Sequence, residues 1–381
     1  MRFLHLADLH LGKRVNEFSL LEDQRFVLEQ ILALVPARQI DAVVLAGDLY
    51  DKPVPPAEAV ELLDWFLTAL ARQGCAVLAV SGNHDSPERL AFGSALLAGA
   101  RVHIAGEYRG APLRVTLNDA FGPVDFTLLP FVRACAVAPF CPADARPRNA
   151  DEAVAAALAA LPPDPARRNV LVAHQFAVAG AQLPAVCDSE IVPVGGVDAV
   201  DVSRFSGYDY VALGHLHGPQ QLGRETVRYA GSPLKYSFSE VRHRKSAPLV
   251  TLAAAGEISV ELVPLAPRRD LRELTGPLAA LLDPKNVTDT DDYLHVTLTD
   301  DEELLDAMAR VRAVYPNLMK LDFDNRRTRA AGGRTAAADV RQKTLPQLFD
   351  EFYALMNGGE MTPAQRRVFA AALRKKGGEE Q

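Results

Sequence analysis

Two features of the sequence predict an α/β fold with a layered core: apolar strands alternate with helices, and polar side chains follow those strands. The first three strands are short runs rich in Val, Leu and Ala at residues 3–7, 42–46 and 76–80. Between them, residues 20–34 and 57–73 carry apolar side chains at helical spacing. Strands and helices in alternation form a sheet that helices cover.

The rest of this region is richer in strands. Residues 126–129, 170–173 and 210–213 are again short apolar runs, and the Ala-rich residues 150–161 favour a helix. Later apolar runs follow one another without helices, at residues 227–230, 249–252 and 258–263. We therefore expect the second half of the core to be rich in β-structure.

Length and composition indicate a globular protein of more than one domain. The 381 residues are too many for one ordinary domain and suit two or three. Hydrophobic residues make up 49% and charged residues 23%, which excludes a disordered chain. The formal charge is −7, from 41 Lys and Arg against 48 Asp and Glu. A general affinity for polyanions is therefore not expected, whereas bound cations or a local basic groove would still permit contact with DNA.

Changes of composition divide the chain into four segments. A Pro-containing stretch at residues 264–269 marks the end of the core, and residues 326–339, rich in Arg, Ala and Gly, are typical of a linker. The predicted segments are a core of residues 1–265, a small α+β domain of residues 266–325, a linker of residues 326–342 and a helical tail of residues 343–381.

The small domain and the tail have simple patterns. In the small domain, strand, helix and strand are expected at residues 293–298, 301–314 and 318–323, with Thr299 or Asp300 as the helix cap. The tail has helical periodicity at residues 345–356 and 363–376. The apolar stripe of its first helix consists of Leu345, Leu348, Phe349, Phe352, Tyr353 and Met356. A stripe of this kind after a linker favours docking onto a partner, and packing against the protein's own domains is the alternative.

The cysteines and the N-terminus favour a cytoplasmic protein without membrane contact. Cys75, Cys135, Cys141 and Cys187 form no C-x-x-C pair, so we expect free, buried thiols in a reducing compartment. The first residues lack the long apolar segment of a signal peptide, and no run of about 18 apolar residues occurs anywhere.

Five of the predicted strands end in side chains that can bind metal ions. In chain order these side chains are Asp8 and His10, Asp48, then Asn83, His84 and Asp85, then His174, and finally His215 and His217. The carboxyl ends of strands in an α/β sheet form the edge where ligands bind. Asp, Asn and His supply oxygen and nitrogen donors, a set that suits Mn²⁺, Fe or Zn²⁺ better than Ca²⁺.

Glycines support the prediction of a metal site. Gly47, Gly82 and Gly214 each precede a candidate ligand, and glycine lets the backbone turn sharply and approach a metal closely. Any one fragment alone would more often be structural, and a single His174 would more often be an ordinary core histidine. A glycine followed by three polar residues after an apolar strand is costly without a ligand. Five such strand ends in order therefore indicate a site.

These residues resemble the motifs of a known family. Their order is similar to that of the calcineurin-like metallophosphoesterases: Asp8-x-His10, Gly47-Asp48, Gly82-Asn83-His84-Asp85, His174 and Gly214-His215-x-His217. Residues 3–13, 47–51, 82–86 and 229–233 resemble, more narrowly, the bacterial SbcD family of nuclease subunits. The resemblance covers the core to about residue 265, and beyond it only the layout is similar. It implies two packed mixed sheets flanked by helices, then a capping domain and a helical tail.

The resemblance implies a centre of two divalent metal ions, for which Mn²⁺ is favoured and Mg²⁺ or Fe are alternatives. It assigns metal one to Asp8, His10, Asp48 and His217, and metal two to Asp48, Asn83, His174 and His215. His84 would contact the phosphate, and Asp85 would orient its imidazole or be a solvated turn residue. Position 51 is Asp where archaeal relatives have a second histidine, so the resemblance assigns Asp51 no role.

The implied activity is that of a metal-dependent DNA nuclease in repair and recombination, an exonuclease on duplex ends and an endonuclease on single strands and hairpins. The implied partners are DNA and the ATPase SbcC, with two copies of each chain in the assembly. No Walker motif occurs, so ATP hydrolysis would come from another chain. The alternatives are a small-molecule phosphoesterase, which would not need the capping region and tail, and a non-catalytic scaffold, which would be free to lose the ligand set.

Candidate contacts with DNA and partners have weaker support. Basic residues near the motifs are candidates for phosphate contacts, with an ordinary solvated charge as the alternative for each: Lys13, Arg89, Arg242 and Lys245. The helices around residues 62–70 and 90–97 match the region of the family's dimer contact, although their pattern also fits core packing.

Overall fold

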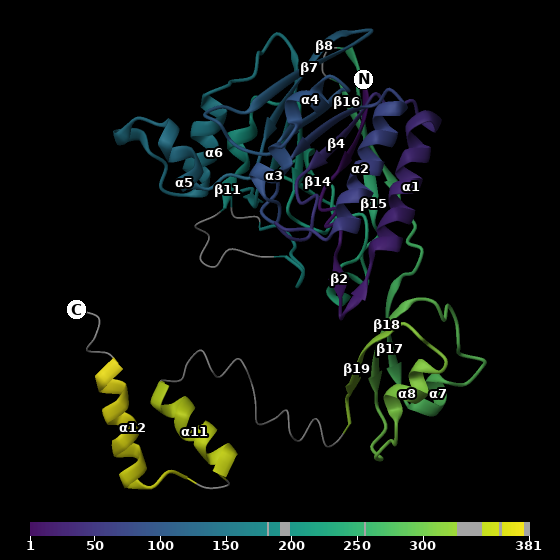
Figure 1. Cartoon of the computed structure of the whole chain (residues 1–381), viewed down its shortest axis with the longest axis vertical. Helices are drawn as coiled ribbons and strands as arrows, with labels where there is room; N and C mark the ends of the chain where they lie inside the picture. The colour runs from purple at the N-terminus through teal and green to yellow at the C-terminus, as the bar shows by residue number, and fades with distance from the viewer. Residues whose placement is uncertain (181–182, 191–198, 255–256, 326–344, 358–359, 377–381) are drawn as a thin grey trace.

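Two large sheets, a small three-stranded sheet and a pair of helices make up the protein (Figure 1). The predicted linker lies outside the part of the chain that the structure describes. The computed structural model describes residues 1–180, 183–190, 199–254, 257–325, 345–357 and 360–376.

The first large sheet has the strand order β16-β15-β1-β4-β5-β6. Strands β1, β4, β5 and β6 are parallel, whereas β15 and β16 run antiparallel to their neighbours. Its strands are β1 (Arg2–Leu6), β4 (Ala42–Ala46), β5 (Ala76–Val80), β6 (Val102–Ala105), β15 (Ser246–Leu252) and β16 (Ile258–Pro264). Two helices cover its outer face, α1 (Leu21–Ala37) and α2 (Ala57–Arg72). The parallel strands thus come with the helical connections that the alternating pattern predicted.

The second large sheet has the order β13-β14-β12-β9-β8-β7. Its four central strands are parallel and its two edge strands are antiparallel. The strands are β7 (Leu113–Asp119), β8 (Gly122–Leu129), β9 (Arg168–His174), β12 (Tyr210–Gly214), β13 (Gln220–Leu222) and β14 (Arg224–Tyr229). Helix α6 (Ala150–Ala159) packs on its outer face and is capped by Asn149, whose side chain accepts from the N–H of Glu152 at 2.8 Å.

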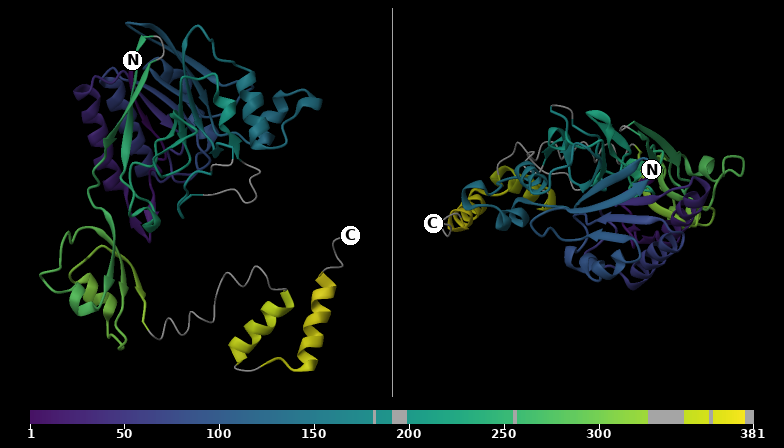
Figure 2. Two further views of the ribbon diagram at one scale, coloured as in Figure 1. Left: turned by 180° about the vertical axis from the view of Figure 1, so that it is seen from behind. Right: turned by 90° about the horizontal axis from the view of Figure 1, so that it is seen from above.

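The two sheets pack face to face, with helices outside them. Along β4, Val43 and Leu45 pack toward α1 and α2, whereas Val44 belongs to the apolar layer between the sheets. In that layer the ring of Phe3 lies 5.5 Å from the rings of both Phe126 and Tyr210. Strand residues that alternate in this way bury both faces of a sheet, which is why these strands are apolar throughout. The prediction of two packed mixed sheets flanked by helices is confirmed (Figure 2).

Shorter elements connect the large ones. The short strands are β2 (Arg14–Val15), β3 (Phe18–Ser19), β10 (Ala177–Val178) and β11 (Val200–Asp201). The short helices are α3 (Pro87–Ala91), α4 (Ser94–Ala98), α5 (Ala134–Val137), η1 (Ala138–Phe140), η2 (Ala143–Ala145), η3 (Val202–Phe205) and η4 (Phe238–Glu240). Among the described residues, no helix is both long and apolar enough to cross a membrane.

A parallel sheet of three strands, in the order β17-β18-β19, forms the small domain. Its elements are β17 (Leu271–Gly276), α7 (Leu278–Leu281), β18 (Tyr293–Leu298), α8 (Ala307–Arg312) and β19 (Leu318–Phe323). It contacts the core through Asp23, a buried side chain of α1 that binds Arg269 and the hydroxyl of Tyr293, both at 2.8 Å. A second ion pair joins Lys235 of the core to Asp270 at 2.8 Å. These contacts place the domain beside the end of the core where β2 and β3 lie (Figure 1).

Two details of the small domain differ from the prediction. The predicted helix at residues 301–314 is shorter, because α8 begins only at Ala307 and Asp306 precedes it with a positive φ of 52°. Asp300 does not cap this helix. Its carboxylate instead accepts a hydrogen bond from the N–H of Leu278, at the start of α7, at 2.8 Å. Asp300 therefore accepts a hydrogen bond at the start of a helix, as predicted, but the helix is α7 and not α8.

The tail consists of α11 (Leu345–Asn357) and α12 (Pro363–Lys376), close to the predicted helices. The two helices contact each other: the ring of Phe349 stacks on that of Phe369 with centroids 3.8 Å apart, and Gln365 donates to the hydroxyl of Tyr353 at 2.8 Å. Phe352 remains 56% exposed and Val368 71% exposed. Part of the predicted stripe thus joins the two helices to each other, and part of it is left in water.

All four cysteines are free, as expected. The expectation that they are buried holds for Cys75 alone, because Cys135 is exposed and Cys141 and Cys187 are half-buried.

Candidate metal centre

The seven predicted ligands come together where the two large sheets meet. Strands β1, β4 and β5 of the first sheet deliver residues from their carboxyl ends, and so do β9 and β12 of the second sheet. Because the parallel strands of each sheet end at the same edge, residues more than 200 positions apart in sequence become neighbours. The residues brought together are Asp8, His10, Asp48, Asn83, His174, His215 and His217.

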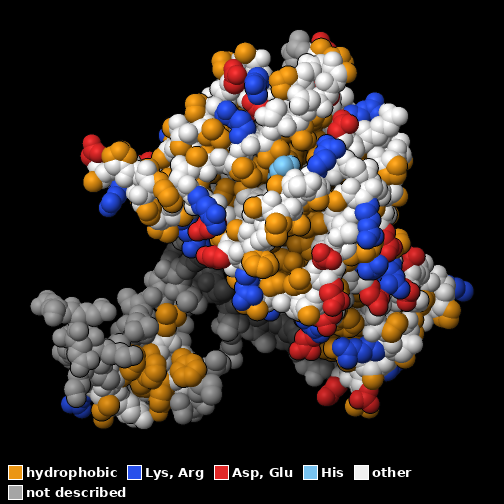
Figure 3. Space-filling view, turned by 45° about the horizontal axis from the view of Figure 1, so that its top comes forward, with side chains coloured by type: hydrophobic (Ala, Val, Ile, Leu, Met, Phe, Trp, Pro, Cys, Tyr) orange, Lys and Arg blue, Asp and Glu red, His pale blue; other side chains and the backbone are white. Residues whose placement is uncertain are grey.

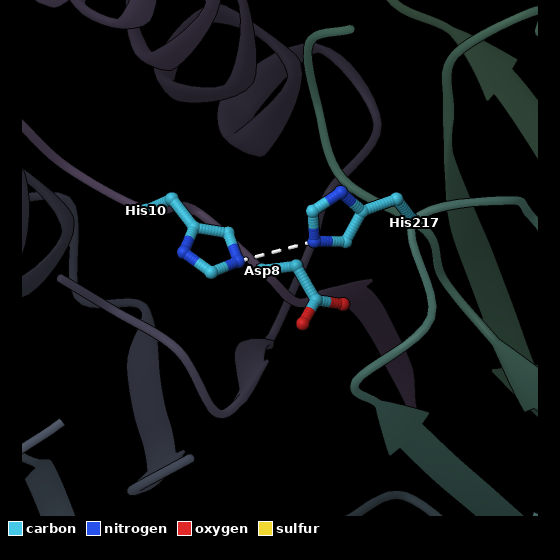
Figure 4. Close-up of side chains that lie close together, drawn as sticks. All are labelled: Asp8, His10 and His217. Atoms are coloured by element: carbon cyan, nitrogen blue, oxygen red, sulfur yellow. Dashed lines mark hydrogen bonds between the residues drawn. The ribbon is translucent and has the colours of Figure 1, made fainter. Parts of the chain in front are cut away.

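One half of the centre contains Asp8, His10 and His217, whose donor atoms lie within 4.8 Å of one another (Figure 4). The Nε2 atoms of the two histidines are only 3.1 Å apart. Asp48 borders this half, with Oδ2 at 3.6 Å from Nε2 of His10. This half matches the set that the resemblance assigned to metal one.

The other half contains Asn83, His174 and His215. Oδ1 of Asn83 lies 3.0 Å from Nε2 of His174 and 2.9 Å from Nδ1 of His215. Oδ2 of Asp48 is 3.4 Å from Nε2 of His174, so the same oxygen faces both halves. Asp48 thus occupies the place that a bridging ligand requires.

The backbone around the centre is held in unusual conformations. Asp8, His10 and Asp48 have positive φ angles of 53°, 43° and 50°, which side chains other than glycine rarely adopt. A Cβ atom on Gly82 would lie 2.1 Å from Oδ1 of Asp48, and one on Gly214 would lie 1.9 Å from the carbonyl oxygen of Ala46. Glycine is therefore required by close approach at both positions, although the approach is to Asp48 and Ala46, whereas the sequence predicted an approach to a metal. The strained backbone is typical of functional sites.

A hydrogen bond on the outer side of His174 determines which of its nitrogens faces the centre. Nδ1 of His174 donates to the carbonyl oxygen of Ala46 at 2.8 Å, which leaves the lone pair of Nε2 directed at Asn83 and Asp48. Both of those partners also present oxygen lone pairs, since a carboxylate is acceptor-only and Asn83 uses its Oδ1. These facing acceptors repel one another unless a proton on Nε2 of His174 or a metal cation lies between them, so this donor set fits divalent metal ions that displace the proton.

The pKa values of the buried side chains also indicate a site for cations. Burial raises the pKa of Asp8 well above its ordinary value. Burial has the same tendency at Asp48, but His174 outweighs it and lowers the pKa of Asp48. For His174 burial alone would lower the pKa, whereas the carboxylates of Asp48 and Asp8 raise it to about 9. Burial lowers the pKa of His215 to about 3 and that of His217 to about 4, which keeps these imidazoles neutral. Without a metal, the positive charge beside the buried Asp48 is the protonated His174, and divalent cations bound by the neutral His215 and His217 would take over this role.

His84 lies at the edge of the centre and is half-buried. The ring nitrogen Nδ1 of His84 donates to the backbone carbonyl of Asp51 at 3.0 Å. The backbone N–H of His84 donates to Oδ1 of Asp48 at 2.8 Å. One donor atom each of His10, Asp48 and His84 also lie within 4.8 Å of one another. Distance alone therefore does not separate His84 from the ligands, and its separate role stays a prediction.

The predicted role of Asp85 is wrong. Its carboxylate does not contact the imidazole of His84 but accepts hydrogen bonds from the N–H groups of Gly82 at 2.9 Å, Leu49 at 3.1 Å and Tyr50 at 2.9 Å. Asp85 thereby ties together the two loops that carry Asp48 and Asn83. The group that orients His84 is the backbone of Asp51.

The side chain of Asp51 contacts two other residues of the centre. Its Oδ1 lies 2.8 Å from Nζ of Lys13 and 3.6 Å from Nδ1 of His10. Burial alone would raise the pKa of Asp51, but His10 and Lys13 lower it to about 2. Lys13 is thus paired with a carboxylate at the mouth of the centre.

The remaining basic candidates lie in different surroundings. Arg242 is exposed and, together with Lys13, lines a hollow of about 840 Å³ between the core and the small domain. Arg89 is exposed in α3 and lines a separate, mostly apolar hollow of about 640 Å³ beside α2. Lys245 is wrong as a DNA contact, because it is 7% exposed and its ammonium group binds Glu240 at 2.5 Å inside the protein.

Sequence reasoning missed three residues that contact His217: Ser189, Glu190 and Glu240. Nδ1 of His217 lies 2.9 Å from Oγ of Ser189 and 3.3 Å from Oε1 of Glu240, and the N–H of His217 donates to Glu190. These residues lie on loops and on the short helix η4, away from any strand end. The sequence hints at Glu240 alone, because this carboxylate precedes a run of basic residues. Such mixed charges are common on protein surfaces, so the hint did not indicate a contact with His217.

The family models match this architecture. A model described as calcineurin-like phosphoesterase matches residues 1–219, which carry all seven predicted ligands. A second model, described as type 5 capsule protein repressor C-terminal domain (SbcD_C), matches residues 267–357. The first match covers more than half of the chain, and the protein belongs to the calcineurin-like phosphoesterases.

Curated relatives define the family further. A protein named as the D subunit of the nuclease SbcCD from Staphylococcus saprophyticus is 31% identical over 377 residues, and one of the same name from Staphylococcus epidermidis is 29% identical over 373 residues. Each alignment covers 96% of this chain and 96% of the relative. Among solved structures, the protein TT1561 of Thermus thermophilus has a TM-score of 0.41 at 15% identity, covering 68% of this chain and 98% of its own. Because the Staphylococcus saprophyticus relative is 31% identical and covers 96% of this chain, the chain is a member of the SbcD family.

Proposed function

We propose that this protein is a metal-dependent DNA nuclease that acts with an SbcC ATPase. The observation that carries the proposal is the convergence of seven oxygen and nitrogen donors from five strand ends, with Asp48 facing both halves. Membership of the SbcD family supports DNA as the substrate, since the relatives are named as nuclease subunits. The cytoplasm, where a bacterial chromosome lies, is the compartment in which we place this activity.

The residues of the centre have separate tasks in phosphodiester hydrolysis. Two divalent cations, held by Asp8, His10, Asp48 and His217 and by Asp48, Asn83, His174 and His215, would supply Lewis-acid catalysis. Because Nδ1 of His84 is bound to the carbonyl of Asp51, Nε2 is the ring nitrogen left for the substrate. As an imidazolium, His84 would donate a hydrogen bond to the phosphate and a proton to the leaving oxygen.

The hollow beside the centre has the charges to hold a nucleic acid strand. Lys13, Arg14 and Arg242 line it from the core, and Lys320 and His295 line it from the small domain. Ser189 and Tyr236 also line it, and the ring of Tyr236 lies 5.6 Å from that of His10. Asp188 and Glu273 also line the hollow, so basic residues outnumber acidic ones there, whereas the face in Figure 3 has basic and acidic side chains mixed, in keeping with the charge of −7. Phosphate binding is therefore expected in this hollow and not over the surface as a whole.

Two further surfaces are proposed to contact protein partners. The exposed side of the tail, with Phe352 and Val368, is assigned to SbcC. The apolar hollow between α2 and α3, next to which Phe92 is 87% exposed, is assigned to a second copy of this chain. Large exposed apolar side chains of this kind are typical of interaction surfaces. The resulting assembly has two nuclease and two ATPase chains.

A cleavage assay tests the proposed function. The purified protein is offered linear duplex DNA, single-stranded circles and a small phosphodiester dye, with Mn²⁺ or Mg²⁺ and then with a chelator. We expect DNA cleavage that is faster in Mn²⁺, because imidazoles suit a borderline metal better than a hard cation. Turnover of the dye alone would indicate a small-molecule phosphoesterase, and no activity with any substrate would indicate a scaffold. Either result would refute the proposal.

A further inference from the structure

A buried ion pair lies directly behind His217, on the side away from the other ligands. Glu240 is 0% exposed and Lys245 is 7% exposed, and Nζ of the lysine is 2.5 Å from Oε2 of the glutamate. Both residues come from the chain segment that includes η4, and none of the hydrolysis steps above uses them. A buried pair of charges is costly to form and does not by itself stabilise a fold, so it calls for a specific reason.

The hydrogen bonds of Glu240 determine where the proton of His217 lies. Glu240 is ionised and can only accept, so the hydroxyl of Ser189 donates to its Oε1, at 2.6 Å. The same hydroxyl oxygen then accepts from Nδ1 of His217 at 2.9 Å, and Oε1 itself is 3.3 Å from this nitrogen. Nδ1 must therefore carry the proton, and the lone pair of Nε2 is directed toward His10, 3.1 Å away.

Lys245 holds the glutamate in place. Its ammonium group uses all three donors inside the protein: Oε2 of Glu240 at 2.5 Å, Oγ of Ser232 at 2.8 Å and the carbonyl oxygen of His217 at 2.9 Å. The last bond connects the lysine to the backbone of the same histidine whose ring Glu240 contacts. Both the ring and the main chain of His217 are thus fixed from behind.

We propose that Glu240, supported by Lys245, is a positioning residue that holds His217 in the Nδ1–H tautomer and so directs Nε2 at metal one. This inference rests on the proposed metal centre and deepens it. It predicts a selective effect, because His174 in the other half obtains its tautomer from the backbone carbonyl of Ala46, which Glu240 does not contact. Loss of Glu240 should therefore weaken metal one and spare metal two.

The variants are chosen so that misfolding does not obscure the result. Glu240→Gln alone would leave the ammonium of Lys245 buried without a counter-charge, which is strongly destabilising. The double variant Glu240→Gln with Lys245→Met removes both charges at similar volume and is the main test. The matched control is Asp119→Asn with Arg168→Met. It removes another largely buried ion pair, with a distance of 2.6 Å, that joins β7 and β9 and does not contact His217.

The measurement is the affinity of each of two Mn²⁺ ions for the full-length chain, by calorimetry and by elemental analysis after dialysis, together with the melting temperature of the metal-free protein. We expect one of the two affinities to fall by about 10–100-fold in the Glu240→Gln, Lys245→Met variant, the range typical for partners that orient metal-bound histidines, with the other unchanged. The control should lower the melting temperature without changing either affinity. Nitrogen NMR of the His217 ring should show the Nδ1–H tautomer in the native protein and a mixture in the variant.

Three outcomes would overturn the inference. If both affinities remain native in the double variant, the network only supports the fold, whatever happens to the melting temperature. If both affinities fall equally, the effect is a general distortion and not positioning of His217. If the native protein fails to bind two ions, the proposed metal centre itself is wrong. This failure is distinguishable from a failure of the Glu240 inference because it appears without any substitution.

Discussion

The large sheets of the core and the sheet of the small domain are both built on parallel strands, but they carry their polar side chains in different places. In the core, Asp8, Asp48 and His174 lie at or just beyond the strand ends, and all three are buried. In the small domain, His295 and Lys320 lie within β18 and β19 on a face that remains accessible.

This difference decides what the charges can do. The buried carboxylates of the core have no water to solvate them, so they require cations in fixed positions. In the small domain, His295 contacts Asp322 at 2.8 Å and Lys320 contacts the same carboxylate at 2.6 Å, and ion pairs that remain in partial contact with water contribute little energy. Such side chains are free to exchange partners with a phosphate. This difference supports the proposal that the core carries out the chemistry and that the small domain contacts the substrate.

The largest effect is expected at Asp48, whose Oδ2 lies 3.6 Å from Nε2 of His10 in one half of the centre and 3.4 Å from Nε2 of His174 in the other. Asp48→Asn should reduce the occupancy of both metal ions and abolish hydrolysis, because the amide lacks the charge that balances two cations. Elemental analysis and DNA cleavage measure the result. Asp125→Asn, at another buried carboxylate that binds Arg167 at 3.1 Å, is the control and should keep both metals. An active Asp48→Asn protein with two bound ions would refute the bridging role.

His84→Gln should lower turnover by about 10²–10⁴-fold, the usual contribution of a general acid or base, while metal and DNA binding persist. Glutamine retains an N–H for the carbonyl of Asp51 but cannot transfer a proton. Single-turnover cleavage and metal content are measured on the same preparation. Loss of metal together with activity would make His84 a ligand and would enlarge the metal-binding set of the core.

Metal binding should depend on pH through His174. Its pKa is raised to about 9, so below this pH a proton occupies the nitrogen that the metal needs, and binding must release that proton. The apparent Mn²⁺ affinity of this half should therefore rise with pH, by up to about tenfold per pH unit below 9 for one released proton. Calorimetry in buffers of different ionisation enthalpy counts the protons released. An affinity independent of pH between 6 and 8 would contradict this ligand assignment.

A smaller effect is expected in the hollow between the core and the small domain, whose charges are proposed to bind substrate without taking part in chemistry. Arg242→Glu with Lys320→Glu should weaken DNA binding and reduce the salt dependence, by roughly 0.7–0.9 in the slope of log K against log salt for each phosphate that is no longer bound. Metal affinities should not change. Lys285→Glu, an exposed lysine of the same domain outside the hollow, is the control. Equal effects of both variants would show that the hollow has no special role.

The smallest effect on the isolated protein is expected in the tail. Phe349 is unsuitable as a target because it packs against Phe369, whereas Phe352 and Val368 are exposed. Phe352→Glu with Val368→Glu should abolish co-purification with SbcC and leave the melting temperature and Mn²⁺-dependent cleavage unchanged. The control Arg367→Glu makes the same change of net charge at an exposed residue that does not line the apolar hollow between the two tail helices, where Tyr353 and Val368 lie, and it should leave co-purification intact. Retained binding to SbcC in the double variant would contradict the proposed docking surface.

The sequence predicted the parts of this protein that depend on local pattern. The candidate ligands that the fold brings together could be selected because each follows an apolar strand. Glycine beside them was expected as well, although the approach that requires Gly82 and Gly214 is to Asp48 and Ala46. The errors concern partners that only the fold brings together. Asp85 binds the N–H groups of Leu49 and Tyr50, more than 30 residues away, instead of the neighbouring His84. Lys245 looked like a surface charge in a basic run, but the fold encloses it with Glu240.

The most direct test of the central claim is a crystal structure with Mn²⁺, using anomalous scattering to locate the metal. Two peaks are predicted, about 3.5–4 Å apart as in two-metal hydrolases. One should lie beside His10 and His217, the other beside Asn83, His174 and His215, with a carboxylate oxygen of Asp48 between them. A single peak, or a pair that excludes Asp48, would contradict the two-metal centre.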